Sequence, residues 1–110
     1  MLDRELLVLA ARAAKMPVTG LFGATGLRIA FDGCVSGYIW NPLEHDGDAL
    51  RLAVKLRLHI SQQSSYVAVM GRLDGPSSNL VQWDEKYYGD PYAATRRAIV
   101  RAAAEVGRTM

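Results

Sequence analysis

The stretch "DPYAATRRAIVRAAAEVGR" (Asp90–Arg108) predicts a long amphipathic helix close to the end of the chain. Asp90 is a favoured N-cap residue and Pro91 suits the first helical position, so this pair marks the beginning of the helix. One face carries apolar side chains at helical spacing and is expected to be buried: Tyr92, Ile99, Ala103 and Val106. The opposite face carries Arg97, Arg101, Glu105 and Arg108, with Arg96 at the border between the two faces.

Upstream, "WNPLEHDGDALRLAVKL" (Trp40–Leu56) predicts a second helix with the same kind of beginning. Asn41 suits the N-cap and Pro42 the first helical position, and Glu44 stands three residues after Asn41, as in a capping box. Asp46 can cap again, and Asp48 places negative charge near the positive end of the helix dipole. The helix proper is expected over 46–56, with a buried stripe of Leu43, Leu50, Ala53 and Val54 and a solvent-facing set of Asp48, Arg51 and Lys55. Leu52 and Leu56 widen the apolar surface, so this helix is expected to contact protein on two sides.

The remaining elements follow from periodicity and turn residues. Apolar positions over Leu2–Lys15 predict a first helix, and the glycine-rich segment 17–26 a loop with a short extended piece at Leu21-Phe22. Residues 27–31 and 35–40 predict two strands joined by a turn at Asp32-Gly33, with a bulge or close backbone approach at Gly37. A second hairpin is predicted around residues 58–61 and 66–70, and a fifth strand within 80–88.

These elements give the order αββαβββα and a single α/β (α+β) domain over residues 1–110. Hairpin-linked strands predict a mostly antiparallel sheet of about five strands. Three amphipathic helices would bury their apolar stripes against the faces of that sheet, as in an α/β/α sandwich.

Composition excludes several classes of protein. Half of the residues are apolar and 22% are charged, which is typical of a folded globular chain. The single cysteine, Cys34, forms no disulfide within the chain and fits a reducing compartment. No apolar run approaches the roughly 20 residues that span a bilayer, and no segment has the order of a secretory signal. A net charge of +2 gives almost no information about a partner.

No group of residues with the spacing of a catalytic or metal site is found, so neither an enzyme nor a cofactor is predicted. Glu44, His45, Asp46 and Asp48 could together bind a metal, but the capping interpretation is favoured because adjacent residues rarely aim at one point. Cys34 has only His45 and His59 as candidate bases and is interpreted as inert. "GLFGATG" (20–26) lacks the Lys-Ser/Thr ending of a phosphate loop.

Two sets of residues are candidates for binding. Helix N-termini attract anions and aromatic side chains can wall a pocket, so a ligand is expected near one set: Trp40, Asn41, Tyr88, Asp90, Tyr92 and Arg96. The second set, Arg97, Arg101 and Arg108, could meet phosphates or an acidic protein surface, although such a stripe is more often a solvated helix face.

The two helical blocks, "WNPLEHDGDALRLAVKL" and "DPYAATRRAIVRAAAEVG", together with "LLVLAARAA" in the first helix, resemble small phage and prophage proteins that carry the phage ABA sandwich domain. The resemblance covers most of the chain but little of residues 61–86. It implies an α/β/α sandwich and an accessory protein made in the cytoplasm of an infected or lysogenic bacterium. It supplies no catalytic residues.

The leading functional hypothesis is therefore a non-enzymatic interaction module that binds a host or phage protein, with self-association into an oligomer. The alternative is a counter-defence protein that binds a small ligand or a nucleotide. Nucleic-acid binding through the arginine stripe ranks third, no membrane association is expected, and an enzyme ranks last.

Overall fold

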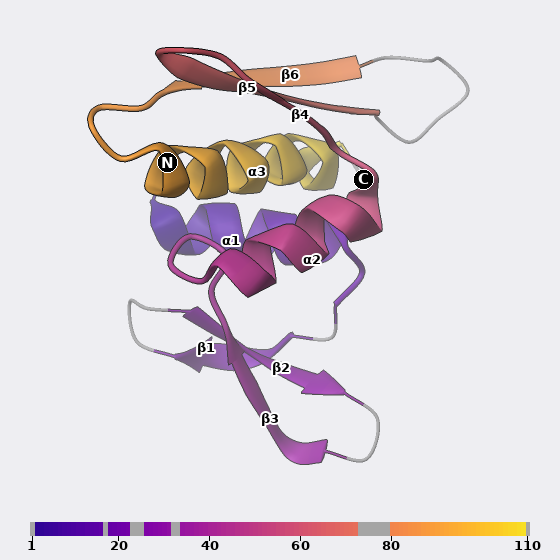
Figure 1. Ribbon diagram of the computed structural model, residues 1–110. Coiled ribbons are helices and arrows are strands. Elements are labelled where there is room, and N and C mark those ends of the chain that lie inside the picture. The colour runs from indigo at the N-terminus through magenta and orange to yellow at the C-terminus, as the bar shows by residue number, and fades with distance from the viewer. Residues whose placement is uncertain (1, 17, 23–25, 32–33, 73–79, 110) are drawn as a thin grey trace.

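The computed structural model describes residues 2–16, 18–22, 26–31, 34–72 and 80–109. Within these residues the chain forms three helices and six strands (Figure 1). The helices are α1 (Asp3–Ala13), α2 (Asp46–Leu56) and α3 (Pro91–Arg108). The strands are β1 (Val18–Phe22), β2 (Gly26–Phe31), β3 (Cys34–Trp40), β4 (His59–Gln62), β5 (Tyr66–Arg72) and β6 (Leu80–Lys86). The predicted α+β class and the three helices are confirmed.

The strands form two separate antiparallel sheets, so the prediction of one sheet of about five strands is wrong. Strands β1, β2 and β3 form the N-terminal sheet, and β4, β5 and β6 the C-terminal sheet, each in sequence order. The additional strand is β1, where only Leu21-Phe22 was expected to be extended. The turn predicted at Asp32-Gly33 lies outside the described residues, but Phe31 and Cys34 on either side of it are paired. The pairing of β2 with β3 is irregular opposite Gly37, as that glycine predicted.

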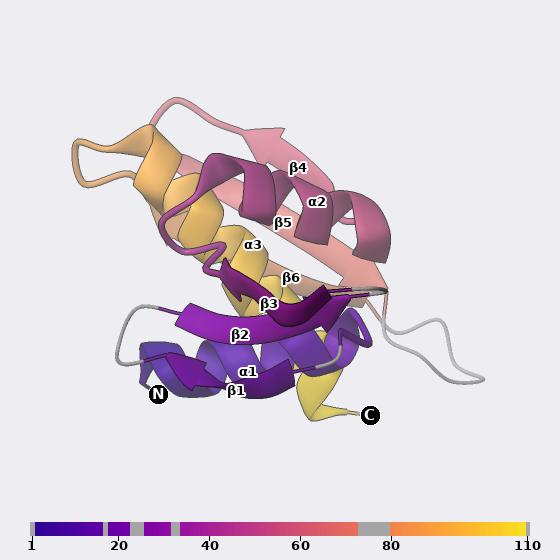
Figure 2. The same cartoon turned by 90° about the horizontal axis from the view of Figure 1, so that it is seen from below.

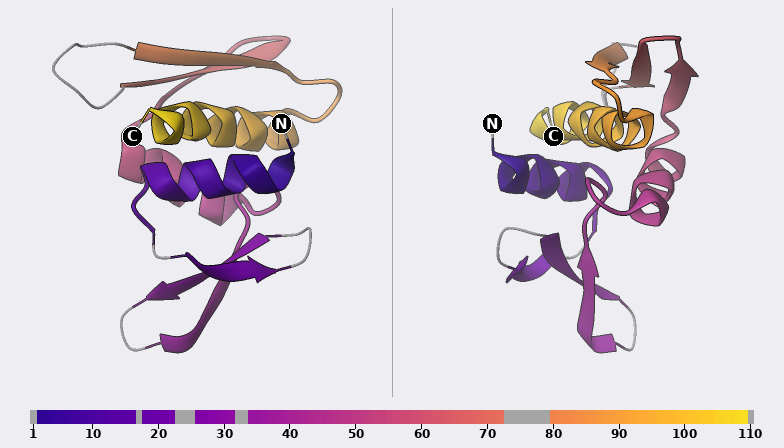
Figure 3. Two further views of the ribbon diagram at one scale, coloured as in Figure 1. Left: turned by 180° about the vertical axis from the view of Figure 1, so that it is seen from behind. Right: turned by 60° about the vertical axis from the view of Figure 1, so that its left-hand side comes forward.

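The layers are stacked in the reverse of the predicted order. The helices lie between the two sheets, with the C-terminal sheet over α3 and the N-terminal sheet on the other side, below α1 in Figure 1. Helices α1 and α2 lie on different flanks of α3 (Figures 2 and 3). The fold is therefore a layered sandwich with helices inside, and not one with helices outside a central sheet. None of the helices in the described ranges is long and apolar enough to cross a membrane.

Helix α3 explains this layer order because it is buried on most of its surface. Residues on nearly every side of it are buried: Ala94, Ala98, Ile99, Val100, Ala102, Ala103, Ala104, Val106 and Gly107. An apolar helix of this kind needs cover on several sides. Helices α1 and α2 and strands β5 and β6 supply that cover. Tyr92, which was expected on the buried face, is 73% exposed.

One core cluster contains side chains from every layer. Leu27 and Trp40 reach it from the N-terminal sheet, and Val67 and Val69 from the C-terminal sheet. The contact between α1 and α3 depends on small residues. A Cβ atom added at Gly107 would lie 1.9 Å from the carbonyl oxygen of Leu9, so only glycine permits this approach.

The beginning of α2 differs from the prediction. Asn41 does not cap the helix; its backbone carbonyl accepts hydrogen bonds from the N–H groups of Glu44 (3.1 Å) and His45 (2.9 Å). Its side-chain Oδ1 accepts one from Leu43 N (3.1 Å), so residues 41–45 form a separate turn that contains Pro42. The predicted helix over 46–56 is confirmed, but the placement of Pro42 at its first position is wrong. For α3 the prediction is confirmed: Pro91 is its first residue and Asp90 Oδ1 accepts from Ala93 N (3.1 Å).

Asp48, predicted to face solvent, is only 5% exposed. Its Oδ2 accepts a hydrogen bond from the backbone N–H of Asn41 (3.0 Å), and its Oδ1 accepts one from Arg51 Nη2 (2.8 Å). The carboxylate thus joins the 41–45 turn to the first turn of α2. With Asp48 facing inward, Ala49, Leu52 and Ala53 are buried. Leu50 and Val54, which were expected in the core, are 60% and 68% exposed.

Candidate functional site

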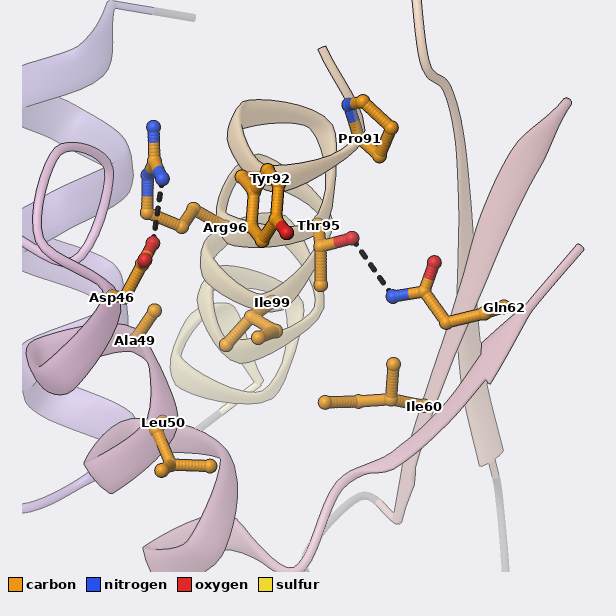
Figure 4. Close-up of a pocket in the computed structure, with 10 residues that line it drawn as sticks. All are labelled: Asp46, Ala49, Leu50, Ile60, Gln62, Pro91, Tyr92, Thr95, Arg96 and Ile99. Atoms are coloured by element: carbon orange, nitrogen blue, oxygen red, sulfur yellow. Dashed lines mark hydrogen bonds and ion pairs between the residues drawn. The ribbon is translucent and has the colours of Figure 1, made fainter.

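The α2–β4 groove is a cavity of about 460 Å³ between α2, β4 and the first turns of α3 (Figure 4). Two of its walls are helical and the third is a strand at the edge of the C-terminal sheet. Its lining combines an apolar floor with a few polar groups: Asp46, Ala49, Leu50, Ile60, Gln62, Pro91, Tyr92, Thr95, Arg96 and Ile99.

Arg96 holds one end of the groove together. Its Nε donates to the carbonyl oxygen of Leu43 (2.9 Å), and its Nη1 donates to Asp46 Oδ1 (2.6 Å). The Arg96 side chain is 19% exposed, whereas that of Asp46 is 70% exposed. The guanidinium therefore fixes the start of α2 against α3, and its charge already has a carboxylate partner.

Strand β4 supplies the opposite wall through alternate residues. Ile60 and Gln62 point to the same face of the sheet because side chains alternate along a strand. Gln62 Nε2 donates to Thr95 Oγ1 on α3 (3.0 Å). The Tyr87 hydroxyl lies within donating distance of Gln62 Oε1 and of the Gln63 carbonyl oxygen (2.7 Å). These contacts position the end of β4 beside the N-terminus of α3.

The backbone of β4 presents hydrogen-bonding groups on the side away from β5. Gln63 N donates to Tyr66 O (2.9 Å), so that opposed pair is a hydrogen-bonded one. Hydrogen-bonded and non-hydrogen-bonded pairs alternate along antiparallel strands, and Ile60 is opposed to Val69 and Gln62 to Val67. Both are non-hydrogen-bonded pairs. The N–H and C=O groups of Ile60 and Gln62 therefore face the free edge of the sheet, beside the groove.

The helical walls carry exposed apolar side chains. Leu50 lines the groove, and Val54 follows it one helical turn later on the same side of α2. Tyr92 stands at the start of α3 at the groove's rim, 73% exposed. Two large exposed apolar side chains, Leu50 and Tyr92, thus line a groove that is itself mostly apolar, and Val54 lies one helical turn beyond it.

The structure brings together only two of the six residues predicted to bind a ligand, Tyr92 and Arg96. Trp40 is buried in the core at 1% exposure, and Asn41 is buried in the turn before α2. Asp90 caps α3 beside the groove without lining it. Tyr88 is 86% exposed in the preceding turn and does not line the groove either.

Sequence reasoning missed the α2 and β4 walls. Leu50 was assigned to the core, and Ile60 and Gln62 were part of an unremarkable hairpin. The one available signal was the second apolar stripe of α2, which indicated contact on two sides but not which side was free.

Each arginine of the predicted nucleic-acid stripe has an acidic neighbour. Arg97 Nη1 lies 3.3 Å from Asp3 Oδ1, and Arg108 Nη1 lies 3.3 Å from Glu105 Oε1. Arg101 Nη1 lies 3.4 Å from Glu85 Oε2, with its guanidinium carbon 5.0 Å from the centre of the Trp83 ring. The three charges are thus partly balanced within the protein, and Arg101 is packed on an aromatic ring.

The acidic residues around the start of α2 are also engaged. Asp46 is paired with Arg96, and Asp48 with Arg51 and the Asn41 backbone. In the described part of the chain, no three His, Cys, Asp or Glu side chains are grouped so that they could hold a metal ion.

Comparisons with protein-family models, with curated proteins and with solved structures found no match to this chain.

Proposed function

We propose that the protein is a non-enzymatic interaction module that binds an extended segment of a partner protein along the α2–β4 groove. The observation that carries this proposal is the free edge of β4, where the backbone groups of Ile60 and Gln62 face outward beside an apolar groove. Such an edge is a template for an added strand, and main-chain hydrogen bonds supply the affinity in this mode of recognition.

The walls of the groove indicate which segment would fit. Side chains of an added strand alternate between its two faces, so every second residue would enter the space bounded by Leu50, Ile60 and Ile99. These walls favour apolar side chains at alternate positions of the partner. Exposed Val54 and Tyr92 would extend the contact beyond the groove.

The setting of this function is proposed from the resemblance of the two helical blocks to phage ABA sandwich proteins, although the layer order is the reverse of the one that this resemblance implied. It supports a phage or prophage accessory protein that acts in the cytoplasm of its bacterial host, with a host or phage protein as partner. A second copy of the chain presents the same free edge, so self-association is an alternative use of the same surface.

A photocrosslinking amino acid placed at position 54 tests the proposal in bacterial cells. We expect one discrete crosslinked protein from position 54, and loss of that product when Leu50→Asp is added. Position 80 is the matched control, because Leu80 is 65% exposed on β6 at the opposite edge of the C-terminal sheet. A product of twice the monomer mass would identify the partner as a second copy.

Equal crosslinking patterns from positions 54 and 80 would refute the proposal. So would a product from position 54 that persists unchanged in the Leu50→Asp background. Far-UV circular dichroism of each variant confirms that the fold is retained.

A small-ligand binder is the second candidate, because a cavity of about 460 Å³ falls within the range of about 300–1,000 Å³ typical of ligand sites. Under this alternative, Tyr92 would form a wall of the site and Thr95 would supply a polar contact. A thermal-shift screen that includes nucleotides tests it: a stabilising compound whose effect is lost in Tyr92→Ala supports it, and no response from any compound counts against it.

A further inference from the structure

A second hollow, which we call the basic hollow, lies where the C-terminal ends of α1 and α2 meet the end of β5. It has a volume of about 280 Å³ and is lined by Ala13, Ala14, Lys15, Lys55, Leu56, Arg57, Arg72 and Val106. These segments come together at the end of the molecule marked C in Figure 1. The α2–β4 groove instead uses the N-terminal ends of α2 and α3, so the two sites do not share a residue.

Four cationic side chains from three separate segments line the basic hollow, and none of its described lining residues is acidic. Five other arginines, at positions 51, 96, 97, 101 and 108, each lie within 4.0 Å of a carboxylate. Lys15, Lys55, Arg57 and Arg72 form no such ion pair with a described residue. Like charges in one hollow repel each other, and an anion would relieve that repulsion.

Compensation of the helix dipoles accounts for only part of this cluster. Cations near a helix C-terminus are stabilising, and Lys55 occupies such a position in the last turn of α2. Backbone N–H groups already bond part of the carbonyl groups in these last turns: Met16 N donates to Ala11 O (3.0 Å), and Leu58 N donates to Ala53 O (2.9 Å). Arg72 is the last residue of strand β5, so it is not part of either helix end.

Two of the four cations occupy backbone positions that favour glycine. Lys15 has φ 56° and Arg57 has φ 55°, and both follow the last turn of a helix. Glycine is the usual residue at such left-handed positions because a Cβ atom is strained there. At both positions the chain carries a long cation despite this strain.

We propose that the basic hollow binds an oligophosphate group. Arg57 and Arg72 carry planar guanidinium groups suited to two-point contact with phosphate oxygens, and Lys15 and Lys55 add mobile point charges. No aromatic side chain lines the hollow among the described residues, so it offers no platform on which a base could stack. Recognition therefore depends on the phosphates, with little preference among bases.

Isothermal titration of the 110-residue protein at low ionic strength tests this inference, with inorganic tripolyphosphate as the probe. Saturable binding is expected, weakening as salt is added. Arg57→Gly is the informative variant, because glycine relieves the left-handed strain and the fold should be at least as stable. We expect this variant to bind tripolyphosphate about tenfold more weakly, and Arg57→Gly with Arg72→Gln more weakly still.

Lys86→Gln is the matched control, because it removes one cation from β6 without touching the basic hollow. Its affinity should stay within about twofold of the wild type, as expected for a distant exposed charge. ATP and a single-stranded oligonucleotide are titrated in parallel: tighter binding of either than of tripolyphosphate identifies the source of the phosphates.

Three results would overturn the inference. The first is that the wild type shows no saturable binding of tripolyphosphate. The second is that Lys86→Gln loses as much affinity for tripolyphosphate as Arg57→Gly does. The third is that a glutamate oligomer of matched charge binds as tightly as tripolyphosphate. The last result would assign the hollow to acidic protein segments. None of these outcomes bears on the crosslinking at position 54, so the two proposals fail independently.

Discussion

At the scale of single residues, Asp48 is the polar side chain on which the beginning of α2 most depends. Replacing it with alanine leaves the buried backbone N–H of Asn41 without an acceptor, because Asp48 Oδ2 is its partner at 3.0 Å. An unsatisfied buried donor costs about 1–3 kcal/mol. We therefore expect Asp48→Ala to lower the free energy of unfolding by about 2 kcal/mol, measured by urea denaturation.

Arg51→Ala is the control for that prediction. It removes the other partner of Asp48. Because the Arg51 side chain is 70% exposed, water can take the place of its guanidinium, so the loss should be smaller than in Asp48→Ala. If Arg51→Ala is as destabilising as Asp48→Ala, the ion pair and not the bond to the Asn41 backbone holds this turn.

Gly107 and Gly47 are helical glycines with opposite surroundings. At Gly107 a Cβ atom would lie 1.9 Å from Leu9 O and 2.8 Å from Leu9 C, both backbone atoms that can move only if α1 moves. At Gly47 the nearest atom would be Arg51 Nη2, at 3.3 Å, the end of a flexible and exposed side chain. We expect Gly107→Ala to destabilise by about 2 kcal/mol or more, because overpacking outweighs the gain in helix propensity.

Gly47→Ala should leave the free energy of unfolding unchanged or raise it slightly, and urea denaturation of both glycine variants measures the difference. A stabilised Gly107→Ala variant would show that α1 and α3 are not in close backbone contact.

At the scale of elements, α2 has two apolar stripes, and only one of them is buried. Leu52 is 2% exposed and Leu50 is 60% exposed. We expect Leu52→Ala to lower the free energy of unfolding by about 2–5 kcal/mol, and Leu50→Ala to change it by about 0.5 kcal/mol or less. Equal losses in the two variants, measured by urea denaturation, would mean that both stripes of α2 are covered.

The limits of α3 could be predicted from the sequence because apolar periodicity and the starting residues Asp90 and Pro91 are local signals. The range of α2 followed from its periodicity, whereas the starting residues proposed for it, Asn41 and Pro42, form a separate turn. The orientation of α2 could not be predicted, because both of its stripes are apolar. Which stripe is buried depends on the hydrogen bond that Asp48 Oδ2 accepts from the backbone N–H of Asn41. Strand β1 was missed because its glycine and the neighbouring proline indicate a loop, and only pairing with β2 makes it extended. The groove was found only in part, because its walls come from three elements far apart in sequence.

At the scale of the whole molecule, the layer order depends on which faces of the sheets and helices pack against each other. Alternation in the strands predicts that each sheet buries one of its faces. Helices packed outside one central sheet would satisfy this condition, and so would helices packed between two sheets. The deciding property is that α3 has buried residues on several sides, which its small alanines permit. Those alanines look weakly apolar in the sequence, so the central position of α3 was not predicted.

One core cluster joins both sheets to the helices, and this predicts that the two sheets unfold together. Trp40 reports on the N-terminal sheet and Trp83 on the C-terminal sheet, so Trp83→Phe and Trp40→Phe give one reporter for each. Within each variant, tryptophan fluorescence and far-UV circular dichroism should show the same urea midpoint, because small chains that share one core unfold in a single transition. The midpoint itself should be lower in Trp40→Phe, since Trp40 is 1% exposed and its replacement leaves a void. If Trp40 fluorescence changes at a lower urea concentration than the circular dichroism signal does, the N-terminal sheet unfolds first. The contact of that sheet with α1 would then contribute less to stability than the contact of the C-terminal sheet with α3.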